Sequence, residues 1–216
     1  MSAGLMSQVW YVSYGSNMSL RRFACYLEGG TPPGGSRRNP GARDRRLPAR
    51  TAPVDLPGTV YFAGESPQWG GGVAFYDHAR PGRTAARGYL VTAEQFADIA
   101  AQEMYRTPRA DDPLAAVVLA PLRDGRHELG PGRYETLLDV GRYDGLPLLT
   151  FTSPHGIELV PHTVPSPTYL SMVRDGLRES RGWDDAQVAT YLGALVPTAA
   201  PDVTGPADLS PEGPVT

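Results

Sequence analysis

The chain has 216 residues and a formal net charge of −3, and all 20 of its basic residues other than histidine are arginine. The absence of lysine excludes Schiff-base catalysis and a P-loop lysine. The negative charge argues against a nucleic-acid-binding protein, and a single cysteine excludes an intrachain disulfide.

This length suits one domain with a sizeable core. We expect that domain to cover residues 1–196, with a Pro-rich tail over 197–216 that has too little apolar surface to order itself. No apolar run approaches the length of a membrane span, and no signal peptide precedes the first apolar run. We therefore expect a cytoplasmic protein with no membrane partner, and the richness in Arg, Ala, Gly and Pro suggests an actinobacterial source.

The first element is the apolar run Val9-Trp10-Tyr11-Val12, which predicts a strand. It leads into Tyr14-Gly15-Ser16-Asn17-Met18, a composition typical of a turn. Backbone N–H groups in such a turn have no ladder partner. They can therefore bind a carboxylate or a developing oxyanion.

A short helix follows, capped by Asn17 or Ser19, and Gly29-Gly30 ends it after Glu28. Residues 29–57 then form a long Pro/Gly/Arg loop. Two interpretations stay open, a loop near the functional site or a solvated basic excursion. The loop holds six arginines: Arg37, Arg38, Arg43, Arg45, Arg46 and Arg50.

Three apolar segments, residues 58–63, 72–76 and 87–91, predict strands that join the first strand in one sheet. Thr92 and Gln95 then form a capping box that opens a helix. Its apolar face carries Phe96 and Ile99, and Glu103 falls on that same face. Burial and the helix dipole would both raise the pKa of this acid toward the range of a general base. The alternative is that Glu103 turns outward into solvent at the last turn.

Residues 115–122 predict another strand, and residues 134–140 and 147–153 predict a hairpin around Asp144-Gly145. Ser166 can cap a helix that has Pro167 in its first turn and ends at Gly182. A last helix is expected over residues 184–195.

Three separated elements together resemble the gamma-glutamylcyclotransferase family. They are Tyr14-Gly15-Ser16-Asn17-Met18 after a strand, Ala101-Gln102-Glu103-Met104-Tyr105 at a helix end, and Pro165-Ser166-Pro167-Thr168-Tyr169 at a helix start. The resemblance spans roughly residues 9–195. It implies a mixed α/β (α+β) fold, with a barrel-like mixed sheet of about five to seven strands flanked by helices.

The same resemblance implies an enzyme that cleaves a γ-glutamyl amide by intramolecular aminolysis, releasing 5-oxoproline and an amine without metal or other cofactor. Glu103 is the implied general acid/base. The implied substrate-binding residues are Tyr14, Gly15, Ser16, Asn17, Met18, Tyr105 and Tyr169. Met104 stands where many members have glycine, and the loops are elaborate, so the leaving amine stays undefined. The arginine loop suits an acidic carrier protein as a further partner.

Three alternatives to this activity differ in the residues they need. A metal enzyme would need Asp77 and the four histidines, His78, His127, His155 and His162, whose spacing matches no standard ligand pattern and gives no support to a metal-dependent deacetylase. Serine hydrolysis lacks a nucleophile elbow around Ser16. The stronger competitor is a non-catalytic binding or maturation protein that holds a carboxylate or peptide terminus in the same pocket.

Overall fold

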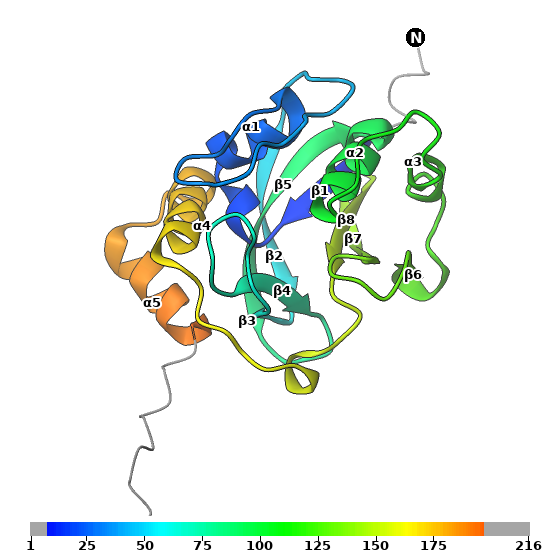
Figure 1. Ribbon diagram of the computed structural model, residues 1–216. Helices are drawn as coiled ribbons and strands as arrows, with labels where there is room; N and C mark the ends of the chain where they lie inside the picture. Colours follow the sequence, from blue (N-terminus) through cyan, green and yellow to red (C-terminus); the bar gives the residue numbers. More distant parts are fainter. Residues whose placement is uncertain (1–7, 197–216) are drawn as a thin grey trace, which may run out of the picture.

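The computed structural model describes residues 8–196, which form an α+β fold built on a mixed sheet (Figure 1). Six strands form this sheet in the order β2-β5-β1-β8-β7-β6, and β3 pairs with β4 in a separate two-stranded sheet. The strands are β1 (Gln8–Ser13), β2 (Thr51–Pro57), β3 (Thr59–Ala63), β4 (Val73–Asp77), β5 (Arg83–Thr92), β6 (Arg126–Glu128), β7 (Thr136–Tyr143) and β8 (Leu146–Thr152).

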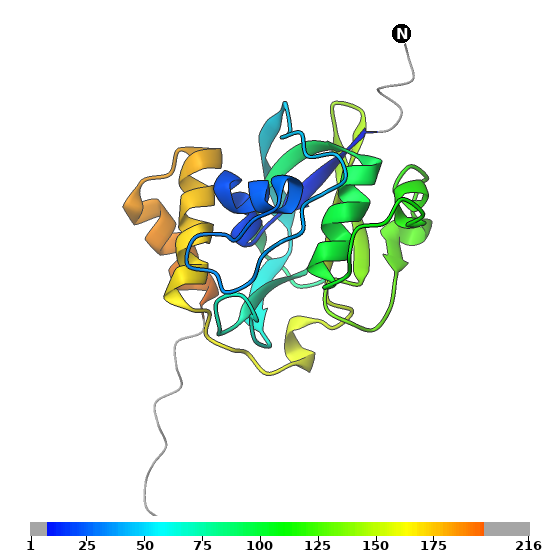
Figure 2. The ribbon, with the colours of Figure 1, turned by 45° about the horizontal axis from the view of Figure 1, so that its top comes forward.

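Five α-helices and three short 3-10 helices complete the described chain, and they separate into two groups around the sheet. In Figure 2, α4 and α5 lie on one side of the central strands and α2 on the other. The α-helices are α1 (Leu20–Glu28), α2 (Ala93–Glu103), α3 (Leu114–Val117), α4 (Pro167–Arg181) and α5 (Asp185–Leu195), and the 3-10 helices are η1 (Ser16–Met18), η2 (Arg123–Gly125) and η3 (Ile157–Leu159).

Strand β1 lies inside the sheet, and helices cover both of its faces. It pairs antiparallel with β5 and parallel with β8. Successive side chains of a strand point to opposite faces. Trp10 and Val12 accordingly enter a core cluster with α4 and α5, whereas Val9 and Tyr11 enter a second cluster with α1 and α2. This two-sided burial explains the uninterrupted apolar run at the start of the chain.

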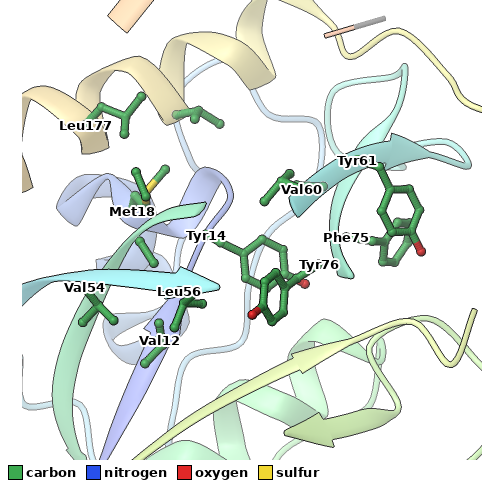
Figure 3. Close-up of a cluster of buried hydrophobic side chains, with 14 of the residues drawn as sticks. Val12, Tyr14, Met18, Val54, Leu56, Val60, Tyr61, Phe75, Tyr76 and Leu177 are labelled. Atoms are coloured by element: carbon green, nitrogen blue, oxygen red, sulfur yellow. The ribbon is translucent and has the colours of Figure 1, made fainter. Parts of the chain in front are cut away.

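The two-stranded sheet is joined to the large one by side-chain hydrogen bonds. The Thr152 hydroxyl of β8 donates to the Tyr76 carbonyl of β4 at 2.8 Å and accepts from the Tyr76 N–H at 2.9 Å. Tyr14 and Tyr76 also pack together, with ring centroids 5.6 Å apart (Figure 3). The β3–β4 hairpin thereby closes one end of the core next to the turn that follows β1.

The capping signals of the later helices are confirmed, whereas Ser19 precedes α1 without a side-chain capping hydrogen bond. Thr92 and Gln95 form the expected capping box of α2, the Ser166 side chain accepts from the Tyr169 N–H, and Gly182 ends α4 in the left-handed conformation. The hairpin of β7 and β8 turns at Asp144-Gly145, where both residues have positive φ.

No helix among residues 8–196 is long and apolar enough to cross a membrane. The tail over 197–216 lies outside the described residues.

Three expectations about strands are wrong. Residues 51–57 form strand β2 and not the end of a loop; two prolines mask it, and an edge position tolerates them. The segments at 58–63 and 72–76 pair with each other and not within the large sheet. Residues 115–122 overlap helix α3 (Leu114–Val117) and form no strand; Pro113 precedes the helix, and the Asp112 carboxylate accepts from the Leu114 N–H at 2.9 Å.

Helix α4 approaches the turn after β1 through a glycine. A Cβ added to Gly176 would lie 2.3 Å from the Met18 Cβ and 2.6 Å from the Ser19 nitrogen. Figure 3 shows Met18 beneath α4, on the side where Leu177 lies. The fold therefore requires a residue without a side chain at this contact.

We predict that Gly176→Ala lowers the free energy of unfolding by about 1–3 kcal/mol, because the methyl group overpacks against backbone. The matched control is Gly193→Ala in α5, where an added Cβ meets nothing within 4 Å. That change should leave stability unchanged or raise it by up to about 1 kcal/mol. Urea denaturation measures both, and equal stability of the two variants would contradict the close contact.

Candidate active site

A pocket of about 210 Å³ opens where the turn after β1 meets the end of α2. Loops after α1, around residues 66–69 and around residues 105–107 and 133 complete its wall. The polar and charged side chains in that wall include Asn17, Arg22, Tyr26, Glu103, Tyr105 and Tyr169. The pocket thus brings together residues from all three motifs of the sequence.

The turn contains a 3-10 helix, η1, and the carbonyl groups of the turn accept hydrogen bonds. The Met18 N–H donates to the Gly15 carbonyl at 3.0 Å. The Tyr89 hydroxyl donates to the Asn17 carbonyl at 2.8 Å, and the Arg87 guanidinium donates to the Met18 carbonyl at 3.0 Å. These bonds occupy the carbonyls of the turn and leave its N–H side toward the pocket.

The N–H groups of Gly15, Ser16 and Asn17 have no backbone acceptor within residues 8–196. The Tyr169 hydroxyl lies against this stretch, because a Cβ added to Gly15 would be 2.8 Å from it. Gly15 therefore provides the space in which Tyr169 and the turn come together. Gly15, Ser16 and Asn17 line the pocket, so their N–H groups are candidate donors to a ligand.

Asn17 connects the turn to the acid on α2. Its side-chain nitrogen donates to Glu103 Oε1 at 2.7 Å and to the Tyr11 hydroxyl at 3.1 Å. Asn17 is 4% exposed, and its Oδ1 atom is buried without a hydrogen-bond partner within residues 8–196. An unpaired buried acceptor is costly, so this atom is available to a ligand donor such as an ammonium group.

Glu103 faces the pocket and not bulk solvent, which decides between its two predicted orientations. Burial is the largest influence on its carboxyl and raises the pKa above the usual value. The Arg22 guanidinium and hydrogen bonds with Tyr26 and Asn17 lower the pKa and offset part of that rise. The result is an acid whose pKa is shifted toward neutrality, as a general base requires.

The other predicted binding residues lie in the pocket wall, at its mouth or outside it. Tyr14 and Tyr169 are buried in the pocket wall, and Tyr105 stands at the mouth with 52% of its surface exposed. Met18 lies elsewhere: its side chain is fully buried in the core, and its N–H is already bonded to Gly15. The structure thus brings Glu103 together with every predicted binding residue except Met18.

The arginine loop lies partly at the pocket and partly away from it, so each of its two interpretations applies to some of its arginines. Arg37 and Arg38 line the pocket. The other four are bonded within residues 8–196 away from it: Arg43 to Asp98, Arg45 to the Glu28 carbonyl, Arg46 to Asp44 and Arg50 to Asp144. The Arg43–Asp98 pair, at 3.0 Å, anchors the loop to α2. Two arginines are therefore site residues, and four are structural or surface residues.

Two site residues on α1, Arg22 and Tyr26, are not among the predicted ones. The Arg22 guanidinium donates to the Tyr26 hydroxyl at 2.8 Å and lies 4.4 Å from the Tyr26 ring centroid. Arg22 is only 5% exposed. Its spacing of four residues from Tyr26, on the buried face of the helix, is the signal that could have identified it.

Within residues 8–196, no group of three or more His, Cys, Asp or Glu side chains could hold a metal ion. The four histidines lie in separate segments: His78 after β4, His127 in β6, His155 before η3 and His162 after it. The metal site considered as an alternative therefore has no cluster to support it in this part of the chain.

Two solved structures share the architecture described above. One is a human protein known as uncharacterized protein loc79017, with a TM-score of 0.51, 14% identity and coverage of 93% of both chains. The other is a gamma-glutamyl cyclotransferase, with a TM-score of 0.51, 13% identity and coverage of 92% of both chains. The chain has a gamma-glutamyl cyclotransferase-like fold. The predicted resemblance is thus confirmed for the fold. Identities this low show nothing about activity.

No family model matches the chain. A curated relative, histone deacetylase 5 of Arabidopsis thaliana, is 29% identical over 202 residues, which cover 87% of this chain. Those residues make up 31% of the plant protein, so the chain spans about a third of that relative's length. None of these comparisons supports an acidic carrier protein as partner.

The raised pKa of Glu103 has a consequence for stability. Between the unfolded and the folded pKa, the folded protein holds a proton that the unfolded chain has released, so stability falls as pH rises through this window. Glu103→Gln removes the titrating group. We predict that the stability of the variant relative to wild type increases as pH rises from about 4. Urea denaturation at a series of pH values measures this, and a constant or shrinking difference would contradict the placement of the carboxyl.

Proposed function

We propose that this pocket catalyses intramolecular aminolysis of a γ-glutamyl amide. The α-amine nitrogen of the γ-glutamyl group attacks its own γ-carbonyl carbon and forms the five-membered ring of 5-oxoproline. The bond between the γ-carbon and the amide nitrogen breaks, and the amide nitrogen leaves as an amine. No water is consumed and no redox change occurs, so the step needs no co-reactant.

The contact that carries this proposal is the 2.7 Å hydrogen bond between Asn17 and Glu103, because it holds the acid beside the donors of the turn. The N–H groups of Gly15, Ser16 and Asn17 would bind the α-carboxylate or the developing oxyanion. The unpaired Oδ1 of Asn17 would accept a hydrogen bond from the α-ammonium group. Tyr14 and Tyr169 would form the wall that bends the substrate, and the Tyr105 ring would lie beside the leaving amine.

Glu103 would carry both proton transfers. As a carboxylate it would remove a proton from the α-ammonium group, and as an acid it would protonate the leaving nitrogen. A pKa shifted toward neutrality suits a group that must act in both forms. Holding the two reacting groups of one molecule in a bent conformation would supply much of the remaining acceleration.

A non-catalytic binding protein remains the competing function. Such a protein would use the donors of the turn to hold a carboxylate. It would have no use for a half-buried acid with a raised pKa facing those donors. That acid favours the enzyme.

We predict that a panel of γ-glutamyl amides contains at least one from which the protein releases 5-oxoproline, and that Glu103→Gln lowers this turnover by about 10²–10⁴-fold. Glu94→Gln, an exposed acid on the same helix, is the matched control and should turn over normally. Mass spectrometry separates 5-oxoproline from glutamate, the product of hydrolysis. Binding of γ-glutamyl ligands without turnover would favour the binding protein, and release of acetate from an acetyl-lysine peptide would favour deacetylation instead.

The hydrogen bond between Tyr26 and Glu103 predicts a shift in pH dependence. This bond lowers the pKa of Glu103, so Tyr26→Phe should raise that pKa and move the acidic limb of the pH–rate profile to higher pH. Tyr191→Phe removes a tyrosine hydroxyl that accepts from the Ala85 N–H, far from the pocket, and should leave the profile unchanged. An unmoved acidic limb in Tyr26→Phe would mean that Glu103 is not the titrating base.

A further inference from the structure

The charges that line the pocket are strongly unequal. Five arginines face it, and Glu103 is the one acid in its lining. Arg106 is paired with Glu135. None of the ion pairs formed within residues 8–196 involves Arg22, Arg37, Arg38 or Arg133. Four guanidinium groups without a carboxylate partner thus surround one small pocket.

Two of these arginines gather around a single aromatic ring at the mouth. The Arg37 guanidinium lies 4.7 Å from the Tyr105 ring centroid, and the Arg133 guanidinium lies 5.7 Å from it. Arg133 also donates to the Tyr105 hydroxyl at 3.1 Å. Like charges held around one ring repel each other, and a bound anion would relieve that repulsion. We call Arg37 and Arg133 the mouth arginines.

Backbone conformation and hydrogen bonds between loops hold the residues of the mouth in place. Tyr105 has a φ of +58°, a left-handed conformation that is unfavourable for a tyrosine and that recurs at functional sites. The Gln68 side chain donates to the Arg37 carbonyl at 3.0 Å. The Arg133 side chain donates to the Glu65 carbonyl at 2.9 Å. Contacts between separate loops therefore hold both mouth arginines before any ligand arrives, which lowers the entropic cost of binding.

We propose that the mouth arginines form a second anion subsite, and that the leaving amine of the substrate carries a dianionic group. A phosphate monoester or a pair of carboxylates has this chemistry, and the guanidinium fork matches the oxygens of either. The proposal rests on the proposed function, because Glu103 and the turn would hold the γ-glutamyl end while the mouth holds the other end. Amides of neutral or cationic amines, polyamines among them, would be poor substrates.

Matched substrates test this subsite. They are the γ-glutamyl amides of O-phosphoethanolamine, of aspartate, of ethanolamine and of putrescine. In wild type, kcat/KM for the first two should exceed that for the ethanolamine amide by at least about tenfold, and the putrescine amide should be the poorest. A higher rate for phosphoethanolamine or for aspartate identifies which dianion the mouth prefers. An equal or better rate for the ethanolamine amide would overturn the proposal.

Variants of the mouth separate charge recognition from catalysis. Arg37→Gln and Arg133→Gln should raise KM for the dianionic amides by about tenfold more than for the ethanolamine amide. The control is Arg45→Gln, in the same loop, whose side chain donates to the Glu28 carbonyl and not to the pocket. An equal loss for neutral and dianionic amides would indicate a merely structural role and overturn the subsite.

A binding measurement keeps the subsite testable even if no amide is turned over. Isothermal titration calorimetry of wild type should detect O-phosphoethanolamine but not ethanolamine, and each mouth variant should weaken that binding by about tenfold. Turnover failing while this binding holds would remove the proposed function but keep the anion subsite. Absent binding, or binding unchanged in both mouth variants, would overturn the subsite whatever the activity.

Discussion

The hydrogen bond from Asn17 to Glu103 joins two parts of the chain that are 86 residues apart, and the rest of the site depends on it. One partner follows strand β1, which the sheet holds on both edges, and the other is the last residue of α2. Because both elements pack in the same core cluster, the turn and the acid have little freedom to separate. Neither group has a defined chemical role alone, whereas together they place hydrogen-bond donors beside a base.

Opposing electrostatic influences act on the pKa of Glu103. Burial makes ionisation of Glu103 unfavourable, and Arg22 with its bonded Tyr26 makes it less so. The net effect is a raised pKa, which suits the acid/base role proposed for Glu103. The same excess of arginine extends outward to the mouth, where the loop after α1 supplies Arg37. The loop and the pocket around Glu103 thus share one excess of positive charge.

Sequence reasoning succeeded where a feature depends on neighbouring residues, as at the caps Thr92 and Ser166 or at the face of α2 that carries Glu103. It failed where a partner distant in the sequence decides the outcome. Strand β2 contains prolines that only an edge position permits, and Arg22 becomes a site residue only because α1 lies beside the pocket. Local propensity and spacing do not predict which elements distant in the sequence pack together.

The central claim, that the turn and Glu103 hold one γ-glutamyl group between them, is tested most directly by a crystal structure of Glu103→Gln with a glutaryl amide. This ligand lacks the α-amine and cannot cyclise. The account predicts that its amide carbonyl lies between residue 103 and the N–H groups of Gly15, Ser16 and Asn17. A ligand bound elsewhere, or bound with that carbonyl turned away from residue 103, would contradict it.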